Sequence, residues 1–297
     1  MDCPHKHFEP NPDHIQLLEQ VAGPIQHIYN FGTDALLRFT DSLGNEALAG
    51  HQSVATLLYR AALARMDGAA VLICAGNTEA AMLVVRSLIE AGANLEYLLQ
   101  GDCARRAECY RHWALRNELE SCELVIAQQR PANDPLLIKS TTRRAEILAL
   151  FQDARCSAID AEYQRLSTNG RYPKWHAAFG GPSTTNKLLK QVVPSDTLML
   201  YSFLSDQVHV NQALTGQQVD FATKRGWFRA IRSPEGAEQV ALLATTFGLM
   251  TTHTFIEKLQ GEGELERYAK WYVEEFKPGY DRLRKIEIKM NHIPQPS

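Results

Sequence analysis

Apolar residues recur every three or four positions along most of the chain, a spacing that places them on one face of an α-helix. Alternating patterns, which are typical of strands, are scarce and short. The sequence therefore predicts an all-α protein, a multi-helix bundle. The expected helices cover residues 12–22, 24–42, 46–66, 69–100, 102–130, 142–168, 195–214, 235–260 and 262–290. Pro24 and Asp102 are expected to begin two of them, because proline is favoured in a first helical turn and aspartate caps helix starts.

One long segment departs from this pattern. Helix-breaking residues follow one another as Asn169-Gly170, Tyr172-Pro173, Gly180-Gly181-Pro182 and Val193-Pro194. They predict a long Gly/Pro-rich loop near 169–194, and a second irregular stretch is expected at 215–234. We expect residues 1–44 to form an N-terminal helical segment and residues 45–297 a helical bundle, the two making one continuous domain.

Composition and charge narrow the class of protein. Hydrophobic residues make up 45% of the 297 residues and charged residues 22%, which is the composition of a folded globular protein. The net charge of -3 supplies no overall attraction for a phosphate-rich partner, although local basic patches can still act. The longest apolar runs are far shorter than the ~20 residues that a membrane span needs. We therefore expect no membrane association.

The six cysteines are scattered without a C-x-x-C pair, and the first residues do not resemble a secretory signal. Reduced thiols and a cytoplasmic location are the expectation.

The predicted helix near residues 80–100 is apolar around most of its circumference, yet it carries a polar stripe. Glu79, Arg86, Glu90, Asn94 and Tyr97 follow one another at intervals of seven, four, four and three, which places them on one face. A charge buried without a partner is costly. The stripe is therefore either an internal salt bridge between Arg86 and Glu90 that fixes the helix packing, or part of a binding or catalytic site.

Two further predicted helices carry polar stripes at helical spacing. These are Tyr201, Ser205 and His209 on one helix, and Arg106, Tyr110, Trp113 and Asn117 on the other. If the three stripes converge, they enclose a cluster that could bind an anion or perform acid–base chemistry. His209 is then the candidate general base or acid, because an imidazole titrates near neutral pH. Alternatively, His209 is a structural histidine inside the bundle.

The other candidates follow from the same hypothesis. Arg86 or Arg106 could hold a phosphate or carboxylate, and Glu90 could orient a partner. The candidate ligand contacts are Tyr97, Tyr110, Tyr201, Ser205 and Trp175. Trp175 lies in the Gly/Pro-rich segment, where an aromatic side chain either anchors the loop on the core or stacks on a ligand.

No motif indicates a metal or a cofactor. The sequence lacks H-E-x-x-H, G-x-x-x-x-G-K-[ST], G-x-S-x-G and G-x-G-x-x-G. No glutamate is followed three positions later by histidine, as a di-iron bundle requires. Cys3, His5, His7 and His14 have an irregular spacing that is a poor match to zinc sites. We expect neither metal nor cofactor.

Three motifs occur in a fixed order along the chain: Arg86-Ser87-Leu88-Ile89-Glu90, then Pro173-Lys174 with Trp175, then Tyr201 with Leu204-Ser205 and His209. In this order they resemble a bacterial all-helical family that carries only a domain-of-unknown-function label. The resemblance spans about residues 45–260. It implies the helical fold and no particular reaction.

A more distant similarity is to the HEPN helical proteins, many of which are ribonucleases of toxin–antitoxin and phage-defence systems. Those enzymes carry arginine, four to six residues and then histidine on one helix. Leu204 stands where that arginine would precede His209, whereas Arg106 and His112 have five residues between them. The resemblance implies metal-independent RNA cleavage. His209 would handle the proton of the attacking 2′-hydroxyl, and Arg86 or Arg106 would stabilise the phosphorane charge.

Three functions remain open at this point. The first is a HEPN-like ribonuclease acting in phage defence or a toxin system, with RNA as partner. The alternative is a non-catalytic binding or interaction protein whose polar network is structural or holds a small anionic ligand, and the third is a small-molecule enzyme. A homodimer is also possible if the apolar surface near the carboxyl end stays exposed; otherwise those residues close the core. They are Phe255, Trp271, Tyr272 and Phe276.

Overall fold

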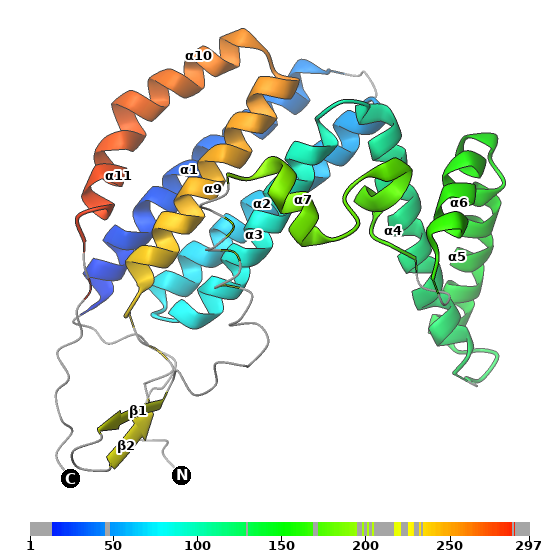
Figure 1. Cartoon of the computed structure of the whole chain (residues 1–297), viewed down its shortest axis with the longest axis horizontal. Coiled ribbons are helices and arrows are strands. Elements are labelled where there is room, and N and C mark those ends of the chain that lie inside the picture. The colour runs from blue at the N-terminus through cyan, green and yellow to red at the C-terminus, as the bar shows by residue number, and fades with distance from the viewer. Residues whose placement is uncertain are drawn as a thin grey trace. The chain divides into compact units, whose positions relative to one another are not determined.

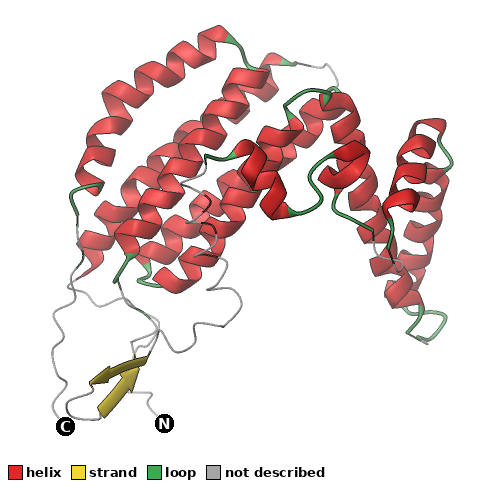
Figure 2. Cartoon of the chain, viewed as in Figure 1, coloured by secondary structure: helices red, strands yellow, loops and turns green. Residues whose placement is uncertain are grey.

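The computed structural model describes residues 14–44, 48–128, 130–168, 172–194, 198, 201, 204, 217–220, 225–228, 232, 234–286 and 288. For 217–220 and 225–228 only the backbone is described. Within these residues the chain is an all-α multi-helix bundle, as the hydrophobic periodicity predicts, with one short two-stranded hairpin (Figure 1 and Figure 2).

The chain forms two compact units that do not follow one another along the sequence. The first unit contains the described parts of Met1–Ala47, Thr56–Glu96 and Val193–Ser297, and the second contains those of Leu48–Ala55 and Tyr97–Val192. Two helices, α2 (Gly50–Cys74) and α3 (Thr78–Leu98), contribute residues to both units. The expected N-terminal segment ending at residue 44 stays a prediction.

The first unit contains most of α2 and α3 and the longest of the described helices, α1 (Ile15–Ser42). Its other elements are α9 (Ala237–Leu259), α10 (Glu262–Trp271), a π-helical turn η4 (Tyr272–Phe276) and α11 (Lys277–Leu283). Strands β1 (Gln217–Asp220) and β2 (Arg225–Phe228) pair antiparallel, with Gln217 opposite Phe228. The irregular stretch expected at 215–234 therefore contains a short ladder, which the weak alternation of these four-residue strands did not reveal.

Helix α9 is central to this unit because small residues bring its neighbours close. A Cβ atom on Gly92 of α3 would collide with Thr251 of α9, and one on Gly248 of α9 would collide with Met66 of α2. The Tyr59 hydroxyl donates a hydrogen bond to Thr252 Oγ1 at 3.1 Å, and the Tyr59 ring stacks on Phe255 at 4.0 Å. Close approach of this kind is what a tightly packed helical core requires.

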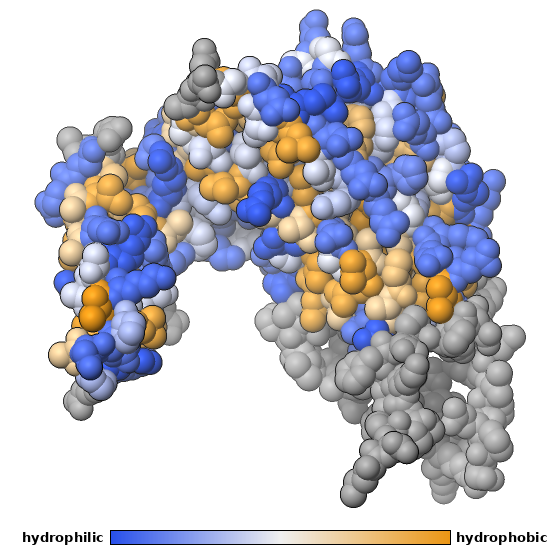
Figure 3. Space-filling model, turned by 180° about the vertical axis from the view of Figure 1, so that it is seen from behind, coloured by the Kyte–Doolittle hydropathy of each residue, from blue (hydrophilic) through white to orange (hydrophobic). Residues whose placement is uncertain are grey.

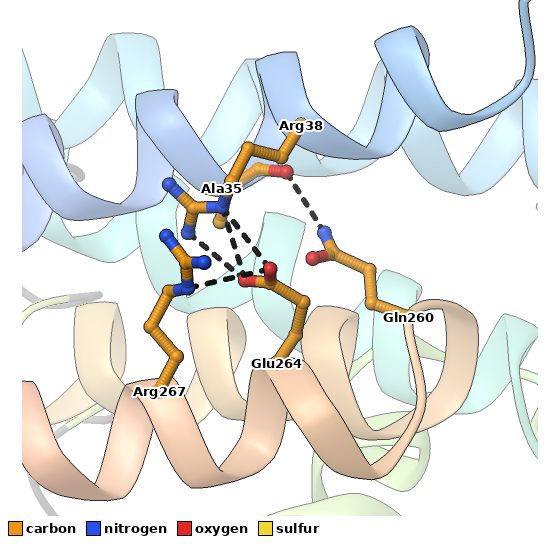
Figure 4. A network of polar contacts seen from close by, with 5 residues as sticks. All are labelled: Ala35, Arg38, Gln260, Glu264 and Arg267. Atoms are coloured by element: carbon orange, nitrogen blue, oxygen red, sulfur yellow. Dashed lines mark hydrogen bonds and ion pairs between the residues drawn. The ribbon is translucent and has the colours of Figure 1, made fainter.

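A polar network joins α1 to α9 and α10 (Figure 4). The Arg38 guanidinium donates to both carboxylate oxygens of Glu264, with Nη2 3.0 Å from Oε2. Arg267 pairs with the same carboxylate at 3.5 Å. The Gln260 side-chain amide donates to the Ala35 carbonyl at 2.9 Å. Glu264 therefore carries most of the polar contact between α1 and α10.

The second unit is built on α4 (Cys103–Ile126), α5 (Pro135–Phe151) and α6 (Ala154–Leu166), followed by a 3-10 turn η2 (Trp175–Gly180) and α7 (Thr185–Val192). Asp102 caps α4 by accepting the Arg105 N–H at 3.0 Å, as the sequence predicts. Asp134 caps α5 by accepting the Leu136 N–H at 2.8 Å, and Pro135 occupies its first turn.

Several boundary predictions are wrong, among them the break expected between residues 66 and 69, which lies instead between α2 and α3. Pro24 lies inside α1 and does not begin a helix, because the buried face formed by Val21 and Ile25 continues across it. The helix expected at 142–168 is two helices, α5 and α6, which pack against each other and against α4. The described part of the segment 169–194 contains less irregular structure than expected, since it includes η2 and α7.

The expected surface near the carboxyl end is largely covered. Phe255, Trp271 and Phe276 are buried within the first unit, which matches the alternative that they close the core. The homodimer stays a prediction. Val273, within η4, is an exposed large hydrophobic side chain in this region, and others lie elsewhere, among them Val71 and Leu124. Figure 3 shows hydrophobic side chains gathered on part of the face drawn there.

Two further expectations concern redox state and membranes. In the described part of the chain the cysteines are free thiols: Cys74, Cys103, Cys109, Cys122 and Cys156. None of the described helices has the length and apolar character that crossing a bilayer demands.

Replacing Glu264 by glutamine should destabilise the protein by about 1 kcal/mol, because the partly buried Arg38 then loses a charged partner. Urea denaturation monitored by circular dichroism measures this difference. Glu266→Gln in the same helix is the matched control, since Glu266 is exposed and should tolerate the change. Equal midpoints for the two variants would show that the network adds no stability.

Candidate functional site

The first cluster of predicted residues lies in the first unit, on α3 and at residue 201. The Arg86 Nη2 atom lies 3.3 Å from Glu90 Oε1, one helical turn away. The Tyr201 hydroxyl donates to Glu90 Oε1 at 2.7 Å, and Arg86 Nη2 donates weakly to the same hydroxyl at 3.4 Å. The three side chains thus form a closed hydrogen-bonded set.

The electrostatics of this cluster follow from partial burial. Tyr201 is buried, and desolvation together with the hydrogen bond to Glu90 raises the pKa of its phenol. The Arg86 guanidinium also lies 5.5 Å over the Tyr201 ring. Its Nε atom is buried and has no hydrogen-bond partner among the described residues. The geometry matches the internal salt bridge that the sequence offered as one alternative.

Two predicted members of this cluster, Ser205 and His209, lie outside the described residues. Their roles as ligand contact and general base therefore stay predictions. Leu204, beside them in sequence, is buried.

The second cluster lies in the second unit and centres on Arg106. Its Nη1 atom donates to the carbonyl oxygens of Tyr97, in the last turn of α3, and of Gln100, just beyond it. The guanidinium lies 3.8 Å over the Tyr97 ring. Gly101 makes this turn possible with φ +62°, a conformation that glycine adopts without strain. Arg106 therefore closes the carboxyl end of α3.

Trp175 connects the remaining predicted residues of this cluster. It is buried, and its ring lies 5.5 Å from Tyr97 and 5.5 Å from Tyr110. The Tyr97 hydroxyl donates to the His176 carbonyl at 3.4 Å. Burial also lowers the pKa of His176, whose Nδ1 lies 2.6 Å from the Pro182 carbonyl oxygen. Trp175 therefore anchors η2 on α4, as one of its two interpretations expects.

A pocket of about 210 Å³ opens beside Arg106, within the second unit. Its wall includes two arginines, Arg105 and Arg106, and three aromatic residues, Tyr97, Trp175 and Phe179. The rest of the wall is small or neutral, with Cys109 and Gln191 among its members. Burial raises the pKa of the Cys109 thiol to about 11, so this cysteine is protonated at neutral pH and is a poor nucleophile.

A partly buried cluster of His112, Arg116 and Asp160, which the sequence analysis missed, lies between α4 and α6. The His112 Nε2 atom lies 3.2 Å from Asp160 Oδ1, and Arg116 pairs with the same oxygen. The imidazole is 2% exposed and stacks between Phe151 at 4.7 Å and Tyr163 at 5.1 Å. Desolvation, with a further contribution from the Arg116 charge, lowers the pKa of His112, so the ring is neutral at pH 7.

The structure thus sorts the predicted residues into two groups, one in each unit. Arg86, Glu90 and Tyr201 meet in the first unit. The second group comprises Tyr97, Tyr110, Arg106 and Trp175.

Two residues of the pocket wall, Arg105 and Phe179, were not predicted from the sequence. Their positions could have indicated them, because Phe179 precedes the Gly180-Gly181 pair and Arg105 neighbours Arg106. Among the described residues, no group of three or more His, Cys, Asp or Glu side chains is placed to hold a metal ion.

Fold and site together define an all-α bundle protein with a cationic, aromatic-walled pocket. Residues 52–221, more than half of the chain, match the model of a family of unknown function, DUF5677, and the chain belongs to this family. No curated protein and no solved structure matches it significantly. The family match supports the first resemblance drawn from the motifs. The remote similarity to HEPN proteins is supported by no match.

The lowered pKa of His112 predicts that stability declines as the pH falls below about 6.5, the value for an unfolded histidine. The unfolded chain then binds a proton that the folded chain excludes, so stability is complete above this pH and is lost toward the lower folded pKa. The buried His176 acts in the same direction. The lowered carboxyl pKa values, such as that of Glu162, act only at still lower pH.

Urea midpoints at pH 7.5 and 5.5 measure the effect. His112→Gln should show a smaller loss between the two pH values than wild type. His27→Gln is the control, because that ring is exposed. An unchanged loss in His112→Gln would exclude His112 as the source.

Proposed function

We propose that this protein binds a small anionic ligand in the pocket of the second unit. The observation that carries the proposal is the composition of the wall, which contains two guanidinium groups and no carboxylate. Arginine is the side chain best suited to hold a carboxylate or phosphate, because its donors form a planar fork. The pocket therefore has a local positive charge although the whole chain is acidic.

Arg106 supports this proposal because its position is fixed before a ligand arrives. One terminal nitrogen, Nη1, is used by the two carbonyls at the end of α3. In the part of the chain that the structure describes, the donors on Nε and Nη2 have no hydrogen-bond partner. A guanidinium held in this way loses little side-chain entropy on binding.

Arg105 adds a second, more exposed donor. Its Nε lies 3.4 Å from Asp102 Oδ2, so its charge is partly balanced. The guanidinium lies 5.1 Å over the Phe179 ring at the pocket wall. The pocket wall includes no imidazole and no carboxylate, and the Cys109 thiol is protonated. These features favour binding over the acid–base chemistry of a small-molecule enzyme.

Arg105→Gln should weaken anion binding about tenfold, because removing one charged donor costs roughly 1.5 kcal/mol or more. Isothermal titration with inorganic phosphate, sulfate and acetate measures the affinity. Arg111→Gln is the matched control on the same helix, since Arg111 pairs with Glu108 and lies outside the pocket wall. Failure of wild type to bind these three anions and larger carboxylates such as benzoate would overturn the proposal.

RNA cleavage in a defence or toxin system is the second candidate function. It is favoured by Arg106 and His112, which stand on α4 at the HEPN spacing. The surroundings of His112 argue against it, because the ring is buried, with Nε2 3.2 Å from Asp160 Oδ1. His209, Arg86 and Glu90 would be the alternative catalytic set. A cytoplasmic location and RNA as a partner belong to this candidate.

Incubation with total RNA in EDTA separates the two functions. If the protein is a binder, RNA should remain intact with wild type and with His209→Ala and His112→Ala. Degradation by wild type that disappears in either histidine variant would instead establish metal-independent cleavage and replace the binding proposal.

A further inference from the structure

Phe179 has a backbone conformation that its side chain disfavours. Its φ of 54° and ψ of 41° place it in the left-handed region, and it is the one non-glycine residue with positive φ in the described chain. A bulky residue in this region is strained, and such strain is concentrated at functional sites. The backbone preference of phenylalanine therefore does not explain why this residue occupies position 179.

Several contacts hold this conformation in place. The Phe179 N–H donates to Glu162 Oε1 at 2.8 Å, and Arg165 donates to both oxygens of that carboxylate. A Cβ atom on Gly181 would collide with the His176 carbonyl and the Tyr97 hydroxyl. The end of η2 is thus packed closely against Tyr97, a residue of the pocket wall.

The strained turn places an aromatic ring where packing does not require it. Phe179 is 41% exposed, so burial of its ring offsets little of the free-energy cost of the backbone strain. Its ring faces the Arg105 guanidinium at 5.1 Å and forms part of the pocket wall. Together with Tyr97 and Trp175 it makes three aromatic members of that wall.

The size and charge of the pocket limit which ligands can bind. The volume of about 210 Å³ is below the ~300 Å³ at which pockets for drug-sized ligands begin, so one ring with a small substituent is the suitable size. Asp102 balances the Arg105 charge in part, whereas Arg106 is bound to neutral carbonyls. The wall therefore has close to one uncompensated positive charge, which matches a monoanion.

We infer that the ligand is an aromatic monocarboxylate with a single ring, and that Phe179 determines the preference for an aromatic ring. The inference rests on the proposed anion binding at this pocket. Arg106 binds the carboxylate, and the aromatic wall contacts the ring through stacking or edge contacts. The strain at Phe179 is then retained because it places this ring at the ligand.

Isothermal titration of the full-length protein with benzoate, cyclohexanecarboxylate and acetate tests the inference. The first two acids have the same charge and number of heavy atoms and differ in aromaticity. Benzoate should bind at least fivefold more tightly than cyclohexanecarboxylate to wild type. In Phe179→Leu this ratio should fall close to one. Tyr172→Leu is the matched control, because Tyr172 is similarly exposed at 38% and lies outside the pocket wall.

A second variant separates a ligand role from a structural one. In Phe179→Gly the melting temperature should be equal to or above that of wild type, because glycine adopts positive φ without strain, while the preference for benzoate disappears. A lower melting temperature together with an unchanged preference would assign Phe179 a purely structural role and overturn the inference.

The outcomes also distinguish this inference from the proposed function. Equal affinity of wild type for benzoate and cyclohexanecarboxylate overturns the aromatic preference and leaves anion binding intact. Binding of phosphate or sulfate with none of the three carboxylates overturns the whole inference and leaves anion binding intact. Absence of binding by every anion overturns both.

Discussion

The arrangement of the candidate site depends on how the carboxyl end of α3 is closed. A helix ends with carbonyl groups that have no partner within the helix. Here Arg106, from the next helix, donates to the carbonyls of Tyr97 and Gln100 and lies flat on the Tyr97 ring. The same contacts satisfy the helix end and fix a guanidinium at the edge of a pocket. One side chain, Arg106, therefore both stabilises the end of α3 and supplies a donor to the proposed ligand site.

The two units handle buried charge differently. In the first unit, Arg86, Glu90 and Tyr201 satisfy one another, so a charged pair is tolerated on an otherwise apolar helix. In the second unit, His112 and Arg116 share the Asp160 carboxylate between stacked rings. Both clusters also hold buried nitrogens without a hydrogen-bond partner among the described residues, such as Arg86 Nε and Arg116 Nε, but these are enclosed by protein, whereas Arg106 lines a pocket. This contrast is why the pocket, and neither cluster, supports the proposed ligand site.

Phe179 illustrates how function and stability can oppose each other. Its backbone strain lowers stability, and its exposed ring recovers little of that loss through burial. Residues with such an imbalance are expected where a protein must present a group to a ligand. The turn that holds Phe179 depends on Gly181, because any side chain there would displace η2 from Tyr97.

The sequence by itself determined the all-α class and the cap at Asp102, and it offered the i,i+4 pairing of Arg86 with Glu90 as one of two alternatives, because these depend on local spacing along one helix. Only the tertiary structure decided that Pro24 stays inside a helix, that Arg106 closes α3 and that His112 meets Asp160. Those outcomes depend on residues distant in sequence or on packing against other helices. Hydrophobic periodicity identifies the buried face of a helix, but it does not indicate which other helix packs against that face.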